Sequence, residues 1–225
     1  MTITTFTRAG AAVAFASMIV GHIAAPELSW TRDPISTYAA HAPLRMWITF
    51  AMLAAAATIL LIGIEVSRIP NAAYNFISAT IPLIAGASAA GLVLLATFKE
   101  TISKTISSSA PTVDQVRLQA FHDAGLLLFF YGSLVFLTLV GIVWFRMRNG
   151  LSRFCAFVPI AMSVASWYVL TRGPFSANAF GLKQRVGLFL IWLGLAAFAY
   201  LAPRPLPASI KANLSGAKAE SNLNV

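Results

Sequence analysis

Polar and ionisable side chains in this sequence gather in three segments, at 26–45, 98–125 and 172–185, that separate long apolar runs. Side chains of these types can bind a phosphate-containing head group, transfer protons or coordinate a metal ion. The residues that we single out as ligand-binding candidates are Asp33, Ser36, His41, Lys99, Glu100, His122, Asp123, Arg172, Gln184 and Arg185. Catalytic residues cannot be assigned, because no local catalytic motif links these positions.

The first segment has the signature of a helix start. Asp33 followed by Pro34 fits an N-cap and a first helical position, so we expect a short helix over 34–41. This helix would lie at the membrane interface, with Trp30 and Tyr38 at head-group depth. Asp33 either takes part in binding or only caps the helix, and the sequence leaves both open.

The second segment ends in a helix that we expect to begin near Val113, because 112–115 has the spacing of a capping box. His122 then lies about one turn inside the membrane, where an ionisable side chain faces protein or a wet cavity. The His122 side chain either takes part in a binding site or only extends to the lipid head groups. Asp123 points about 100° away around the helix axis and need not share its partner.

The third segment leads into the last apolar run through Gly181-Leu182-Lys183-Gln184-Arg185. Lys183 and Arg185 can act as plain interfacial anchors. Alternatively, Arg185 is buried between helices and needs a carboxylate, for which Asp33, Glu100 and Asp123 are the candidates.

All three histidines, His22, His41 and His122, fall on the same predicted side of the membrane. Histidines with an aspartate can bind zinc, but the chain has neither an HxxxH nor an HExxH pattern. We therefore expect no cofactor and keep a zinc site on these histidines as a minor alternative.

The elements that must position these residues are transmembrane helices. Of the 225 residues, 58% are hydrophobic and only 10% are charged, with a mean hydropathy of +0.77, whereas soluble domains carry about 25% charged residues. Six segments approach the ~20 apolar residues of a spanning helix, at 9–25, 46–64, 74–97, 121–145, 154–171 and 186–202. We expect one all-α domain over 1–202, an antiparallel six-helix membrane bundle, followed by a polar, mobile tail at 203–225.

Charge counting does not fix the orientation of this bundle, because each side of the membrane receives eight of the 16 Lys and Arg residues. The arginines at 146, 148 and 153 are clustered against two helix ends, which favours a cytoplasmic loop there. We therefore expect both termini in the cytoplasm of a multi-pass protein of the plasma (inner) membrane. We also expect the first run to be an uncleaved span, since Pro26 follows its one plausible cleavage point. The net charge of +9 reflects such anchoring and not nucleic-acid binding.

Together, the three junctions resemble a known family. Asp33-Pro34-Ile35-Ser36, Phe98 with Phe121-His122-Asp123-Ala124, and Gly181-Leu182-Lys183-Gln184-Arg185 are similar to motifs of the bacterial and archaeal membrane family catalogued as domain of unknown function 998. The resemblance covers about 7–202 and implies a six-helix bundle without an established activity. The family tends to have Phe-Pro-Thr-Asp after the third span, where this chain has Phe98-Lys99-Glu100-Thr101.

Three functions remain open at this level. The first is a non-enzymatic protein that binds a lipid head group, or a membrane-protein partner or second copy, at the face formed by the first, third and fifth loops. The second is a membrane-embedded hydrolase of a lipid amide or ester, with or without a metal, in which His122 acts as base or ligand and Asp33, Ser36 and His41 support it. The third is a small transporter or permease subunit, for which charges deep inside the spans would be the sign.

Overall fold

The computed structural model describes residues 3–24, 28–33, 35–40, 45–68, 75–98, 112–147, 151–173 and 179–201. Every element in these ranges is a helix: α1 (Ile3–Ile23), α2 (Ile35–Ala40), α3 (Arg45–Ser67), α4 (Asn75–Thr97), α5 (Val113–Met147), α6 (Leu151–Cys155), α7 (Phe157–Arg172) and α8 (Phe180–Leu201). Six of them, α1, α3, α4, α5, α7 and α8, are long and apolar enough to cross a membrane. The predicted all-α, six-span bundle is confirmed.

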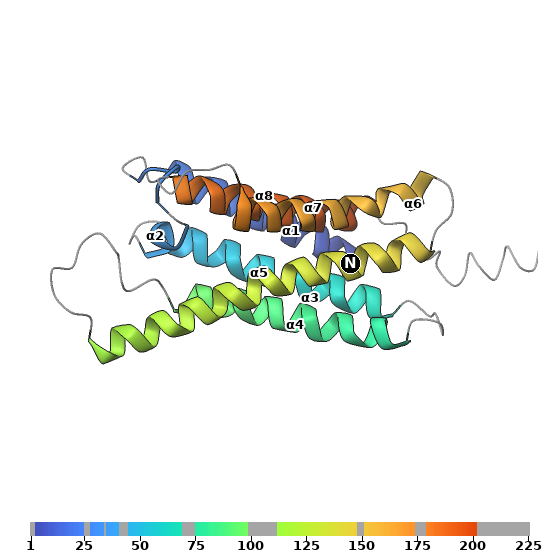
Figure 1. Cartoon of the computed structure of the whole chain (residues 1–225), viewed down its shortest axis with the longest axis horizontal. Helices are drawn as coiled ribbons and strands as arrows, with labels where there is room; N and C mark the ends of the chain where they lie inside the picture. Colours follow the sequence, from blue (N-terminus) through green and yellow to red (C-terminus); the bar gives the residue numbers. More distant parts are fainter. Residues whose placement is uncertain are drawn as a thin grey trace, which may run out of the picture.

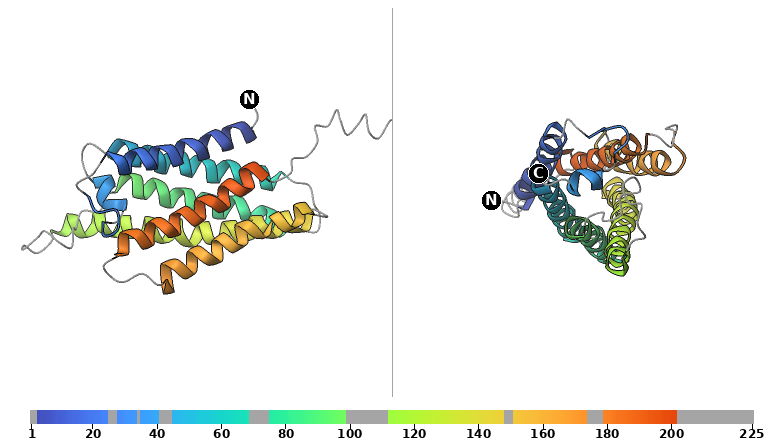
Figure 2. Two further views of the ribbon diagram at one scale, coloured as in Figure 1. Left: turned by 90° about the horizontal axis from the view of Figure 1, so that it is seen from above. Right: turned by 90° about the vertical axis from the view of Figure 1, so that its left-hand side faces the viewer.

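The six long helices run antiparallel to their neighbours along one common axis (Figure 1). Each long helix packs against the next long helix along the chain, and α8 also touches α1 more lightly. Seen from one end, the long helices form a ring, and the short α2 lies over its centre (Figure 2). The alternating directions bring the C-terminal end of α1, α2 and the N-terminal end of α8 to the same end of the bundle.

Glycines allow close backbone contact between α4 and α5. A methyl group at Gly91 would lie 2.5 Å from the backbone nitrogen of Phe129, and one at Gly125 would lie 2.9 Å from the carbonyl oxygen of Gly91. Small residues allow such backbone contact between membrane helices. Gly86, on the same helix as Gly91, has no neighbour within 4 Å of an added methyl, so only some of the small residues in this span serve packing.

The capping box predicted at the start of α5 is present. Gln115 accepts a hydrogen bond from the Thr112 N–H at 2.8 Å, and Thr112 accepts one from the Gln115 N–H at 3.3 Å. These two bonds satisfy N–H groups that no helical carbonyl can reach. As a result α5 starts eight residues before the apolar run predicted at 121–145, and its polar first turns extend past the membrane.

The fifth span differs from the continuous helix predicted at 154–171. It is split at Ala156 into α6 and α7. Pro159 then falls in the first turn of α7, where its missing N–H costs no helical hydrogen bond. The break between α6 and α7 thus lies three residues before Pro159. The proposed tail at 203–225 lies outside the described residues.

Candidate functional site

The start of α8 is interlocked with the segment that follows α1. Leu182 donates its N–H to the Thr31 carbonyl at 2.9 Å. The Gln184 Oε1 accepts a bond from the Ile35 N–H at 2.8 Å, and the Arg185 Nη1 donates to the Asp33 carbonyl at 2.7 Å. Three nearby positions on α8 thus bind the backbone between 31 and 35. This contact joins the first and the third polar segments of the sequence.

Gly181 makes this interlock sterically feasible. A methyl group there would collide with the Asp33 carbonyl oxygen, and it would lie 2.8 Å from the Arg185 Nη1 and 2.9 Å from the Arg32 carbonyl carbon. The loop backbone can therefore lie directly on the first turn of α8 only because residue 181 has no side chain.

Arg185, His22 and Tyr38 form a compact cluster at this end of the bundle. The Arg185 Nε donates to the His22 Nε2 at 2.8 Å, and the His22 Nδ1 lies 2.7 Å from the Met18 carbonyl oxygen. The rings of His22 and Tyr38 stack with centroids 4.8 Å apart, and the Arg185 guanidinium lies 4.7 Å from the Tyr38 ring centre. A carbonyl only accepts, so His22 carries its proton on Nδ1 and offers a bare Nε2 to Arg185.

The charge of Arg185 meets neutral groups in these contacts: an imidazole, a backbone carbonyl and a phenol ring. The carboxylate of Asp33 accepts a hydrogen bond from the Ser29 N–H at 2.7 Å and so closes the turn before α2. The Nη2 of Arg185 is buried and has no hydrogen-bond partner within the described part of the chain. A buried guanidinium with an unsatisfied donor is costly unless a further acceptor reaches it.

Beside this cluster lies an open hollow of about 470 Å³ between α1, α2 and α8. Arg185, His22 and Tyr38 form its polar end, and its remaining lining is apolar: Phe15, Met18, Ile19, Ile23, Leu28, Trp30, Ile35, Leu188, Phe189 and Trp192. Several of these apolar side chains are exposed on the outside of the bundle, Ile23 and Trp30 by 75% and 61%. The hollow therefore opens toward the surface that a transmembrane protein presents to lipid.

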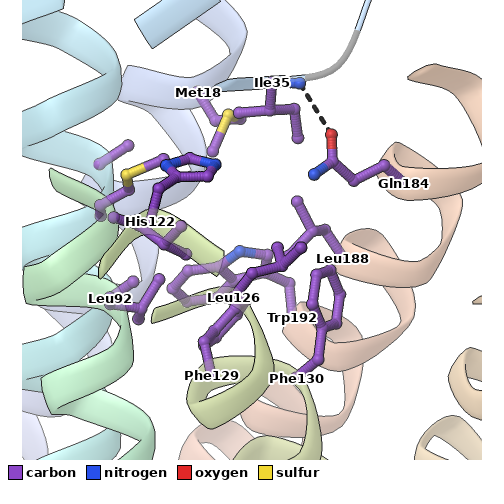
Figure 3. A pocket seen from close by; sticks show the side chains of 14 residues that line it. Met18, Ile35, Leu92, His122, Leu126, Phe129, Phe130, Gln184, Leu188 and Trp192 are labelled. Atoms are coloured by element: carbon purple, nitrogen blue, oxygen red, sulfur yellow. Dashed lines mark hydrogen bonds between the residues drawn. The ribbon is translucent and has the colours of Figure 1, made fainter. Parts of the chain in front are cut away.

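A second, smaller hollow of about 40 Å³ lies inside the ring beneath α2. Figure 3 shows His122 of α5 and Gln184 of α8 pointing toward its upper part from opposite sides, above the side chains of Phe129, Phe130 and Trp192. The His122 Nδ1 lies 2.9 Å from the Phe98 carbonyl oxygen, so it carries the proton and Nε2 is the acceptor. This volume suits one or two water molecules better than an organic ligand.

The sequence-based candidates separate into four groups. Asp33, Gln184 and Arg185 come together, as described. His122 is buried at the inner hollow, while Asp123 is exposed and accepts a bond from Gln119 at 2.8 Å. Arg172 ends α7 as an exposed side chain and does not line the larger hollow. Ser36 belongs to α2, although its side chain is not described, and His41, Lys99 and Glu100 lie outside the described residues.

Two expectations about this end of the molecule need correction. Tyr38 is not an exposed interfacial side chain but is buried, 1% exposed, because its ring packs against both the His22 ring and the Arg185 guanidinium. Arg185 binds the backbone carbonyl of Asp33 and not its carboxylate, because that carboxylate is used within the turn.

The zinc alternative depended on His22, His41 and His122. Both ring nitrogens of His22 are engaged, by Met18 and by Arg185. Among the described residues no group of three metal-binding side chains occurs, while His41 lies outside them. A zinc site stays an untested prediction.

Sequence reasoning missed the pairing of His22 with Arg185. His22 lies inside the first predicted apolar run and Arg185 directly precedes the last one, near the same predicted membrane surface, and both lie within candidate spans. Intramembrane ionisable residues usually pair with one another or face a cavity, and this rule would have linked the two.

The fold and this buried arginine cluster define the protein as a polytopic membrane protein of six transmembrane helices, with a polar site at one end of the bundle. The chain belongs to the family described as protein of unknown function DUF998, whose model matches residues 8–201. No curated protein and no solved structure matches the chain.

Proposed function

We propose that this end of the bundle binds the anionic head group of a membrane lipid. The observation that carries the proposal is the Arg185 Nη2, a buried charged donor without a partner among the described residues, beside a hollow large enough for a ligand. Ligand-binding pockets commonly have volumes of about 300–1,000 Å³, and the hollow of about 470 Å³ lies within this range.

Charge complementarity favours an anion. The groups that hydrogen-bond to or stack on the guanidinium, namely His22, the Asp33 carbonyl and Tyr38, are neutral, and the Asp33 carboxylate acts on it only through its charge. A phosphate or carboxylate oxygen at Nη2 would complete the hydrogen bonding of Arg185 and supply a counter-charge, and guanidinium groups bind such oxyanions strongly.

The surroundings favour a lipid over a water-soluble anion or a protein partner. The polar end of the hollow lies near the C-terminal end of α1 and the N-terminal end of α8, and the ends of spanning helices are where we expect lipid head groups. The rest of the lining is apolar and open toward the outside of the bundle. A molecule with one charged end and an apolar body matches both parts at once.

The test compares lipids that co-purify with the wild type, Arg185→Gln, Arg185→Lys and Arg172→Gln, quantified by mass spectrometry. We expect Arg185→Gln to retain about tenfold less anionic lipid, the loss expected for one charge-assisted hydrogen bond. Arg185→Lys should keep part of it, and Arg172→Gln, an exposed arginine at the same end, should keep all. An Arg185→Gln protein that elutes as the same folded species with unchanged anionic lipid would refute the proposal.

The hydrolase and transporter hypotheses remain predictions. No contact among the described residues specifically favours either one, and the side chain of Ser36, which the hydrolase hypothesis used, is not described.

A further inference from the structure

The hollow beside Arg185 continues along the outside of the bundle. A neighbouring hollow of about 240 Å³ lies between α1 and α8, lined by Ala11, Ala12, Phe15, Phe189, Trp192, Leu193, Ala196 and Tyr200. Phe15, Phe189 and Trp192 line both hollows, so the two meet at these rings. We call the combined feature the α1–α8 groove.

The length of the groove can be estimated from either helix. His22 and Ala11 are separated by 11 positions on α1, and Arg185 and Ala196 by 11 positions on α8. At 1.5 Å per residue, each pair spans about 16 Å along the bundle. This is about half of the ~30 Å hydrocarbon core of a bilayer, which is the depth of one leaflet.

The groove changes from polar to apolar along its length, as a lipid molecule does from its head group to its acyl chains. Among the described residues that line the groove, the one charged side chain is Arg185 at one end, and aliphatic, aromatic and small side chains line the rest, with Tyr200 at the far end. The Phe15 and Phe189 rings face each other across it with centroids 6.4 Å apart, and both are about half exposed. α1 packs on α8 more lightly than long helices that follow one another along the chain pack together.

We propose that the α1–α8 groove holds an acyl chain of the anionic phospholipid whose head group binds Arg185. This inference rests on the proposed function and adds that one acyl chain of the lipid binds at a defined place on the protein. The ligand is then a membrane phospholipid extracted from one leaflet, and neither a free phosphate nor a short soluble acid fills the site.

Trp192 offers a reporter inside the groove. In the variant Trp30→Phe, Trp47→Phe, Trp167→Phe, two tryptophans remain: Trp192, which lines the groove, and Trp144, which is fully buried. The variant is placed in phosphatidylcholine vesicles, and either brominated phosphatidylglycerol or brominated phosphatidylcholine is added, because bromine quenches tryptophan fluorescence on contact.

We expect quenching by brominated phosphatidylglycerol to saturate at a low mole fraction, as for a specific site. Brominated phosphatidylcholine should quench only in proportion to its mole fraction, as for lipid that exchanges freely around the protein. Equal, proportional quenching by both lipids would overturn the inference.

Two further variants distinguish binding of the acyl chain in the α1–α8 groove from binding of the head group at Arg185. Ala12→Phe fills the groove without contact to Arg185, and it should remove the saturable quenching while anionic lipid still co-purifies. Ala16→Phe, an exposed position on the same helix outside the groove lining, should change nothing. If saturable quenching persists in Ala12→Phe, acyl-chain binding in the α1–α8 groove is refuted, while the head-group proposal stands. If the amount of co-purified anionic lipid does not depend on Arg185, the head-group proposal is refuted.

Discussion

At the scale of single residues, the state of His22 decides how Arg185 is held. The imidazole accepts from the Arg185 Nε only while its Nε2 is unprotonated, because Nδ1 already donates to the Met18 carbonyl. The stacked Tyr38 ring fixes the plane of the imidazole and also faces the guanidinium. His22 therefore acts as a positioning residue that holds the Arg185 side chain at the polar end of the hollow.

His22→Phe should lower the stability of the protein, because it keeps the ring contact with Tyr38 but leaves the Arg185 Nε without an acceptor. A buried donor that loses its partner costs about 1–3 kcal/mol. His22→Gln should recover part of this loss, since its amide oxygen can accept. Thermal unfolding in detergent measures both, and equal midpoints for the two variants would argue against the hydrogen bond.

At the scale of elements, α2 and α8 are joined through backbone groups. The first N–H of α2, on Ile35, bonds to Gln184, so a side chain from the last transmembrane helix satisfies the start of the short helix. At the other end of the bundle, the Arg8 Nε donates to the Ala199 carbonyl at 3.1 Å and so satisfies the end of α8. Both ends of α8 are thus tied to segments from the beginning of the chain.

The α4–α5 contact gives a matched pair of glycine variants. Gly91→Ala should destabilise the protein by about 1–3 kcal/mol, the usual cost of overpacking, because its methyl would press on the backbone of α5. Gly86→Ala meets open space and should leave stability unchanged or raise it by up to about 1 kcal/mol through helix propensity. Thermal unfolding in detergent compares them, and similar shifts for both would contradict the packing described.

At the scale of the whole molecule, six crossings place the Arg185 site at the end of the bundle opposite the start of α1 and the end of α8 (Figures 1 and 2). If the arginine cluster at 146–153 lies in the cytoplasm, the lipid proposed for this site would come from the outer leaflet. The orientation thus determines which pool of lipid reaches Arg185.

This orientation can be tested with a single cysteine. In a Cys155→Ser background, Arg32→Cys introduces a thiol at an exposed position next to α2. We expect a membrane-impermeant maleimide to label it in intact cells, because the tight arginine cluster at 146–153 favours an orientation in which the opposite loops lie outside. If the introduced thiol is labelled only after the membrane is permeabilised, the orientation is the opposite one, and the site faces the inner leaflet.

The sequence by itself determined the class of fold, because six apolar runs in a chain with few charges can satisfy their backbone groups in lipid only as helices. It also determined the start of α5, since the Thr112 and Gln115 capping box is a local interaction. Even the common end of the first and third polar segments followed from the alternation of six crossings.

The tertiary structure alone decided which polar residues meet. His22 and Arg185 lie 163 positions apart, and no local pattern records their contact. Tyr38 had the sequence signature of an interfacial anchor, and only the packing of α2 over the ring buried it. The physical reason is that hydrophobicity sets how deep a residue lies in the membrane, whereas rotation of each helix and the path of each loop set its partners. Those depend on the fit of all helices together.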